Sequence, residues 1–420
     1  MSYLDSMESQ ADWPTGCADG NVGKNPCELQ IDLLCRGISV DPSCELARDA
    51  RGFSRTRAGL GSGLEMVLAG APPLAREIWV NAPVHEHFVA DTPFLLRLGA
   101  TGGYEALDRR TSQVHGVRLP AEPAWYGSRA PSGQEMSRIG VLQGTYLAIY
   151  VGATCTFWSQ ELQCRFCTTG LNPDTHAAKQ VDDVVATALA AKAESGVTFV
   201  HLNTGYQGGA AARLVAPHVA AIKEKVGALV GVQITPEVSL DEFDRLIDLG
   251  VDHFSFCFEY FDPETFRRLC PGKDRALGQE RFFRALEHCQ RRLPRGACSG
   301  EIVAGNEPLE STMAAIDYIT ELGAFPTVCI FRPLIGSAMQ DEPSPGYEDM
   351  LSVMQHVWAR CRDRGVPVGL APNLEVSLIV QPTDTAYLAR GTLHDRWYQT
   401  KLRLLRRLAR STFRRRVQPG

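Results

Sequence analysis

The sequence predicts an α/β fold, a full or partial TIM-type βα barrel with an irregular N-terminal extension and a basic C-terminal helix. From about residue 146 onward, short β-branched or apolar runs alternate with helical patterns in six clear units. Serial alternation predicts parallel strands joined by right-handed crossovers, and six units suit a barrel. A doubly wound open sheet is the alternative, but no Gly-x-Gly-x-x-Gly follows the first strand, which argues against its dinucleotide-binding form.

The expected elements follow in order along the chain. A first strand is expected at 146–151, where six apolar or aromatic residues follow one another. A helix is expected from residue 181, because valine, alanine and leucine recur there at i, i+3, i+4, i+7 and i+8. Further strands are expected at 198–202, 229–234, 253–258, 300–304 and 326–331, with weaker candidates at 367–371 and 374–380. Other helical patterns fall near 210–226, 276–292, 309–322 and 346–364.

Composition divides the chain into three parts. Residues 1–140 are rich in Gly, Pro and Ala with little sustained periodicity, and they are interpreted as an extension. The barrel is assigned to residues 141–385. Residues 386–420 are assigned to a basic helical tail, on one face of which lie Leu402, Leu405 and Ala409. Its last thirty residues carry nine Lys or Arg and a single acid.

Composition also limits the classes of function. The 420 residues are 44% hydrophobic, and no run approaches the roughly 18 apolar residues that would span a bilayer. Residues 1–10 lack the basic and apolar regions of a signal peptide, so a cytoplasmic protein without membrane contact is expected. A basic tail on an acidic body is not typical of a dedicated nucleic-acid binder. In a reducing compartment the thirteen cysteines are not expected to form disulfides, and a close cluster of them indicates a metal or redox site.

The most closely spaced cysteines are Cys155, Cys164 and Cys167, a C-x8-C-x2-C array. The array follows the first barrel strand, at the carboxyl end where such barrels place their active sites. Structural zinc sites and ordinary iron–sulfur clusters take four protein ligands, whereas this array supplies three thiolates. Three ligands leave one metal position open for a substrate or a cofactor. A structural or incidental pair at Cys164 and Cys167 is the alternative.

In spacing and position this array resembles the cluster motif of the radical S-adenosylmethionine (SAM) superfamily, usually C-x3-C-x2-C with an aromatic residue before the last cysteine, here Phe166. The resemblance covers about residues 140–340 and is closest to the biotin-synthase-like branch; the longer first gap is a departure. It implies that the three cysteines hold a [4Fe–4S] cluster at which one electron cleaves SAM into methionine and a 5′-deoxyadenosyl radical. It also implies hydrogen abstraction from a small-molecule substrate and an electron donor such as flavodoxin or ferredoxin.

The resemblance further implies that SAM is contacted at the carboxyl ends of other strands. The expected cofactor-binding residues are Phe166, Asn203, Thr204, Gly205, Glu259, Glu301 and Arg332. The Asn-Thr-Gly of this set stands where the family commonly carries Gly-Gly-Glu to bind the SAM amino group. The alternative for Glu259 is a surface acid with no role in binding. Glu301 is expected either to point into the barrel or to form an ion pair. Arg332 is expected either to bind a carboxylate or to form a structural ion pair.

Two other classes of function stay open on the sequence alone. One is a non-redox zinc protein in which Cys164 and Cys167 join remote ligands, and the other is a catalytically inactive barrel that binds a partner. Four N-terminal cysteines lack close spacing and are interpreted as structural: Cys17, Cys27, Cys35 and Cys44. Six more are expected to pack as core thiols: Cys257, Cys270, Cys289, Cys298, Cys329 and Cys361. The second substrate is not readable, because pocket specificity depends on side chains from many loops.

Overall fold

The computed structural model describes residues 23–44, 46, 63–72, 74, 76–237 and 239–417. At its centre lies a seven-stranded sheet in the order β13-β12-β11-β10-β9-β8-β7. Strands β8 to β13 pair in parallel, and β7 pairs antiparallel with β8. The strands are β7 (Val141–Gln143), β8 (Tyr146–Tyr150), β9 (Phe199–Gly205), β10 (Leu229–Ile234), β11 (His253–Glu259), β12 (Cys298–Ala304) and β13 (Phe325–Ile330).

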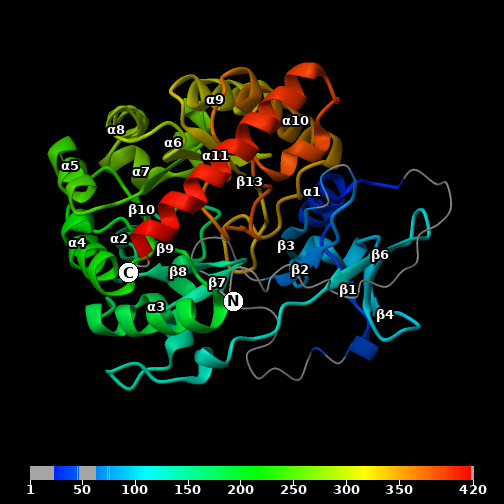
Figure 1. Cartoon of the computed structure of the whole chain (residues 1–420), viewed down its shortest axis with the longest axis horizontal. Coiled ribbons are helices and arrows are strands. Elements are labelled where there is room, and N and C mark those ends of the chain that lie inside the picture. The colour runs from blue at the N-terminus through cyan, green and yellow to red at the C-terminus, as the bar shows by residue number, and fades with distance from the viewer. Residues whose placement is uncertain are drawn as a thin grey trace.

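Helices that follow strands β8 to β13 along the chain cover the outer face of the curved sheet (Figure 1). They are α3 (Val181–Ser195), α4 (Ala211–Ala221), α5 (Leu240–Asp248), α8 (Gln279–Arg292), α9 (Leu309–Glu321) and α10 (Tyr347–Asp363). Because neighbouring strands follow sequence order without reversal, the sheet has no topological switch point. The predicted partial barrel is therefore confirmed, and the doubly wound alternative is wrong.

Irregular backbone spans the open side of the barrel, between the edge strands β7 and β13. Thr145, in the turn after β7, donates from its backbone N–H to Glu375 O (3.0 Å). Asn81 of the N-terminal region donates in the same way to Ser377 O (2.7 Å), and Arg332 after β13 donates to Asn81 O (2.6 Å). The weaker strand candidates at 367–371 and 374–380 are wrong, because prolines within and beside these runs lack the N–H that a strand ladder needs.

The N-terminal extension contains a second sheet, in the order β1-β4-β5-β6-β2-β3, and is more regular than the sequence indicated. Its strands are β1 (Ser39–Val40), β2 (Leu64–Leu68), β3 (Ile78–Ala82), β4 (Phe94–Leu98), β5 (Tyr104–Asp108) and β6 (Gln113–Arg118). Helix α1 (Pro26–Arg36) begins with a capping box between Asn25 and Glu28 and packs on β3. Cys27, Cys35 and Cys44 are buried in this core, and Cys17 lies outside the described residues.

The basic C-terminal helix is α11 (Leu393–Val417), which passes across the barrel at the end where the parallel strands begin (Figure 1). Its first turns are anchored through Asp395, which pairs with Arg362 (2.8 Å) and accepts from Trp358 Nε1 (2.8 Å). Tyr398 is fully buried, and its hydroxyl donates to Val366 O. Within the described residues, no helix is long and apolar enough to cross a membrane.

Two adjacent residues of α11 test whether this docking stabilises the fold. Tyr398→Ala should lower the free energy of unfolding by about 3–5 kcal/mol, since it leaves a cavity beside Trp358. Trp397→Ala is the matched control, because the Trp397 side chain is 60% exposed and its loss should change stability by about 0.5 kcal/mol or less. Urea unfolding followed by circular dichroism measures both. Equal effects of the two substitutions would show that α11 does not dock as described.

Candidate active site

The cysteine loop begins at the carboxyl end of β8 and contacts the segments that follow β9 and β11. Cys155 precedes a one-turn helix, α2 (Thr156–Ser159), whose Thr156 N–H donates to Tyr206 O after β9 (2.9 Å). Phe157 of this turn is buried, and its ring stacks on Tyr206 with centroids 4.1 Å apart. The eight-residue gap between the first two cysteines therefore forms a docked helical turn, which explains the departure from the shorter spacing.

Backbone hydrogen bonds fix the remainder of the loop. Arg165 donates to Leu269 O (2.8 Å), and Ala338 donates to Arg165 O (2.9 Å). Cys167 donates to Cys164 O (3.0 Å), so the C-x2-C pair forms a tight turn. Cys164 and Cys167 are thereby held on ordered backbone on both sides of Arg165.

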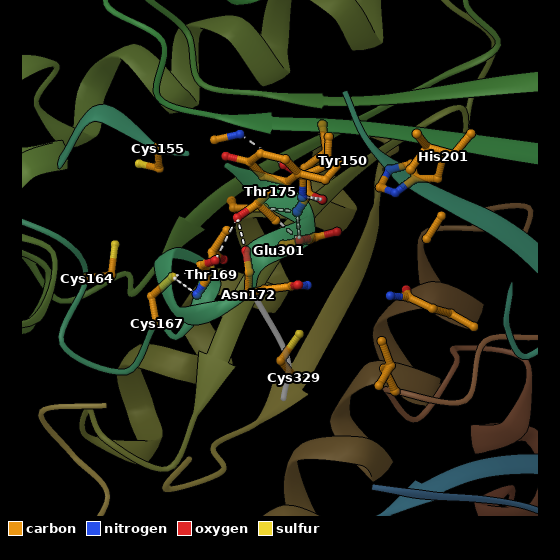
Figure 2. Close-up of a pocket in the computed structure, with 18 of the residues that line it drawn as sticks. Tyr150, Cys155, Cys164, Cys167, Thr169, Asn172, Thr175, His201, Glu301 and Cys329 are labelled. Atoms are coloured by element: carbon orange, nitrogen blue, oxygen red, sulfur yellow. Dashed lines mark hydrogen bonds between the residues drawn. The ribbon is translucent and has the colours of Figure 1, made fainter. Parts of the chain in front are cut away.

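The three thiols line one cavity of about 300 Å³. Figure 2 shows them gathered on one side of it, with His201 on the opposite side. Gly205 at the end of β9 makes this approach feasible: a Cβ there would lie 2.9 Å from Cys155 Cβ, and its φ of +62° suits glycine. Among the described residues, no three Cys, His, Asp or Glu side chains converge tightly enough for a single metal ion. Three thiols around a shared cavity fit a larger cluster that takes one external ligand.

The surroundings of the three thiols differ. Burial raises the pKa of Cys155 to about 11 and also raises the pKa of Cys167. Cys167 Sγ accepts from the Thr169 N–H at 3.4 Å. A hydrogen bond with Cys270 lowers the pKa of Cys164, and the Lys273 charge acts in the same direction. Cys270 is therefore beside the candidate cluster, a placement that the sequence did not indicate.

Glu259, the last residue of β11, lines the same cavity and is not a surface acid. It has a φ of +65°, a left-handed conformation that is unusual for a residue other than glycine and typical of constrained functional positions. Its carboxylate forms an ion pair with Lys273 (2.5 Å) of α7 (Pro271–Ala276), and Lys273 Nζ also donates to Cys257 O (2.7 Å). The sequence analysis missed Lys273, because a lysine in a Pro-Gly-Lys-Asp stretch resembles a solvent-exposed turn residue.

A chain of polar side chains crosses the barrel interior deeper in the cavity. Asn203 of β9 donates to Gln233 Oε1 (2.7 Å) of β10, and Gln233 Nε2 donates to Glu301 Oε2 (2.6 Å) of β12. Cys257 Sγ lies 2.6 Å from the same Glu301 oxygen, and Ser255 donates to the other. Burial raises the pKa of Glu301, opposed by these hydrogen bonds. Glu301 thus points into the barrel and is held there by neutral partners.

The other residues expected to contact SAM differ in their partners and in whether they line the cavity. Phe166 and Gly205 line the cavity, and Phe166 packs edge-on against Tyr260. Thr204 is fully buried and donates to Gly205 O. Arg332 also lines the cavity but is tied to Asn81 of the N-terminal sheet. The expectation of core thiols is confirmed for Cys270 and Cys329, which are buried in the core, although Cys329 also lines the cavity. It is wrong for Cys257, which is only partly buried and faces the cavity.

A second cavity, of about 480 Å³, lies at the amino-terminal ends of the strands. Phe199, His253 and Phe325 line it, and the rings of His253 and Phe325 stack with centroids 5.5 Å apart. Burial lowers the pKa of His201 to about 3 and that of His253 to about 4, so both are neutral. The two cavities share six lining residues, Tyr146, His201, Glu301, Thr327, Val376 and Ile379, and therefore lie on either side of the same layer of the barrel interior.

The chain is similar in sequence to proteins of known function. A family model described as the radical SAM superfamily matches residues 161–319, which include Cys164 and Cys167. Bacteriochlorophyllide c C-7(1)-hydroxylase of Chlorobaculum limnaeum is 21% identical over 361 residues, covering 80% of this chain and 84% of that protein. Among solved structures, methylornithine synthase is 16% identical, covers 62% of this chain and 80% of its own, and gives a TM-score of 0.42. A radical SAM methyltransferase from Sphaerobacter thermophilus is 14% identical over 64% of this chain and 75% of its own, with a TM-score of 0.41.

Proposed function

The chain belongs to the radical SAM superfamily, and on that premise we propose that it reductively cleaves SAM at a cluster held by Cys155, Cys164 and Cys167 and abstracts hydrogen from a bound substrate. It is an enzyme whose cofactors are a [4Fe–4S] cluster and SAM. The observation that carries the proposal is the placement of three thiols from one loop around a single cavity that inward-facing residues of the barrel strands also line. This placement favours the enzyme over the zinc protein and the inactive barrel.

The chain's own residues hold and shield the reacting groups. When bound, the reduced cluster supplies the electron that breaks the C–S bond of SAM. The stacked pair Phe157–Tyr206 and the pair Phe166–Tyr260 pack around the cysteine loop, whose three thiols are partly buried. The electrons come from a reductant, for which we propose a flavodoxin or a ferredoxin.

The charged pair Glu259–Lys273 suits the methionine end of SAM, which carries an ammonium and a carboxylate. Both side chains line the thiol cavity, and their opposite charges match the two groups of the zwitterion. Asn203 and Gly205 at the end of β9, two strands away from β11, line the same cavity, and the Asn203 amide accepts from the Gly205 N–H and donates to Gln233. Glu301 and Arg332 complete the proposed lining deeper in the barrel.

A conjugated ring compound is the class of substrate that the second cavity favours. Its lining combines aromatic side chains with neutral histidines, and it shares His201 with the thiol cavity. The relative named above acts on bacteriochlorophyllide c, according to its name, and matches most of this chain. We therefore propose C–H functionalisation on a flat, largely apolar ring system.

Bacteriochlorophyllide c is the probe for this class of substrate. Added to the reduced protein with SAM, it should increase the yield of 5′-deoxyadenosine, because a bound substrate donates a hydrogen atom to the 5′-deoxyadenosyl radical. His201→Phe should remove the increase, whereas His356→Ala on the surface of α10 should retain it. If addition of the probe to the wild-type protein leaves the yield of 5′-deoxyadenosine unchanged, this ring system is excluded as the substrate.

Single replacements of the cysteines test the cluster assignment. Cys155→Ala, Cys164→Ala and Cys167→Ala should each lose most of the roughly four iron atoms per chain expected of one cubane cluster, since a methyl group cannot replace a thiolate. Cys270→Ala and Cys329→Ala are the matched controls and should retain iron. Iron and sulfide content after anaerobic reconstitution and 5′-deoxyadenosine formation are measured together. A full cluster in Cys155→Ala, or its loss in Cys270→Ala, would reassign the ligands.

Replacement of Glu259 tests the SAM pocket separately from the cluster. Glu259→Gln should retain iron and weaken SAM binding about tenfold to hundredfold, because a charge-assisted hydrogen bond is worth about 1.5–3 kcal/mol. Glu307→Gln is the control, since Glu307 accepts from the N–H groups of Phe261 and Asp262 and does not line the cavity. Equilibrium dialysis with labelled SAM measures both. Equal affinity in Glu259→Gln and the wild type would remove Glu259 from the pocket.

A further inference from the structure

Helix α11 presents an apolar stripe to solvent on the side opposite its docked face. The exposed fractions of the four stripe residues are 83% for Leu393, 60% for Trp397, 55% for Leu404 and 65% for Leu408. At 100° per residue, their spacing of four, seven and four residues places all four within about 60° of the helix circumference. We call this set the α11 stripe; it differs from the Leu402, Leu405 and Ala409 face, which packs toward the protein.

The α11 stripe concentrates exposed apolar surface in one place. Ten large hydrophobic side chains are exposed in the described part of the chain, and four of them belong to this stripe. The other six are dispersed over elements from β4 to the segment after β13. Scattered exposed leucines are ordinary, whereas four large exposed apolar side chains along one face of a single helix indicate an interaction site.

Unpaired positive charge borders the stripe. Arg396, Arg403 and Arg407 are exposed and lie along one flank, at three residues after Leu393, one before Leu404 and one before Leu408. Among the described residues, no acidic side chain forms a salt bridge with these three arginines, and Asp395, the acid of the helix, is buried against Arg362. The flank therefore carries a net positive charge that nothing on the described surface neutralises.

We propose that this face of α11 binds the surface of an anionic membrane, with the stripe inserted among the lipid chains and the arginines at the phosphate groups. An interfacial helix has this composition, with Trp and Leu on one face and Lys or Arg beside it, and it lies in the plane of the membrane without crossing it. Each arginine near an anionic surface contributes about 1 kcal/mol. A second copy of the chain is disfavoured, because an antiparallel two-fold α11–α11 contact would place the two arginine flanks side by side on one edge. The proposal departs from the sequence-based expectation of no membrane contact.

Co-sedimentation of the full-length protein with vesicles tests the proposal. The protein should sediment with vesicles of phosphatidylcholine and phosphatidylglycerol, remain in solution with phosphatidylcholine alone, and be released by high salt. Arg403→Gln combined with Arg407→Gln should weaken binding about 25-fold, which is about fivefold for each lost kcal/mol. Leu404→Ser with Leu408→Ser should abolish it, whereas Leu189→Ser with Leu249→Ser, exposed elsewhere, should leave it unchanged.

Three outcomes would overturn the proposal. They are absence of binding to either vesicle type, binding retained after Leu404→Ser with Leu408→Ser, and a wild-type dimer that this same double variant converts to a monomer. Light scattering detects the dimer in the absence of vesicles. Because the stripe lies outside both cavities, SAM cleavage by the Leu404→Ser with Leu408→Ser variant should equal that of the wild type, which separates this proposal from the proposed function.

Discussion

The parallel pairing of β8 to β13 in sequence order is the constraint on which the site depends. It brings the cysteine loop, the Asn-Thr-Gly turn and Glu259 to one rim, although they are separated by up to about a hundred residues of chain. Each residue at a strand end is then fixed by the ladder behind it rather than by its own loop. The thiols, the Glu259–Lys273 pair and the interior carboxylate of Glu301 consequently face a single cavity.

An incomplete barrel must exclude water from its open side, and this protein uses its N-terminal domain for that purpose. The backbone at 373–381 bonds to the β7–β8 turn on one side and to β3 on the other, and Arg332 joins β13 to the same strand. Arg332 therefore has a structural partner as well as a place in the cavity wall. The buried charge of Arg332 is tolerated because Glu86 Oε1 lies 3.8 Å from its guanidinium.

The sequence was sufficient for the barrel strands and the cysteine cluster, because buried parallel strands are continuous apolar runs and the cysteines are close in sequence. It was insufficient where function depends on contacts distant along the chain. Lys273 and Cys270 reach the site only after α6 (Pro263–Leu269) and α7 fold beneath the cysteine loop. The sheet of the extension was missed because its strands are short and several, such as β6, are only partly buried, which weakens the alternating pattern. On α11 the sequence contains two apolar stripes, and only the structure shows which one packs.

Electron paramagnetic resonance of the reduced protein, recorded with and without SAM, tests the central claim most directly. If three thiols hold a cluster with one open iron, the reduced protein should give a [4Fe–4S] signal whose g values change when SAM binds. The change should be absent from Cys164→Ala, which should lack the signal altogether. A [4Fe–4S] signal that is identical with and without saturating SAM would show that the fourth iron is not open to SAM, and would contradict the account of the site.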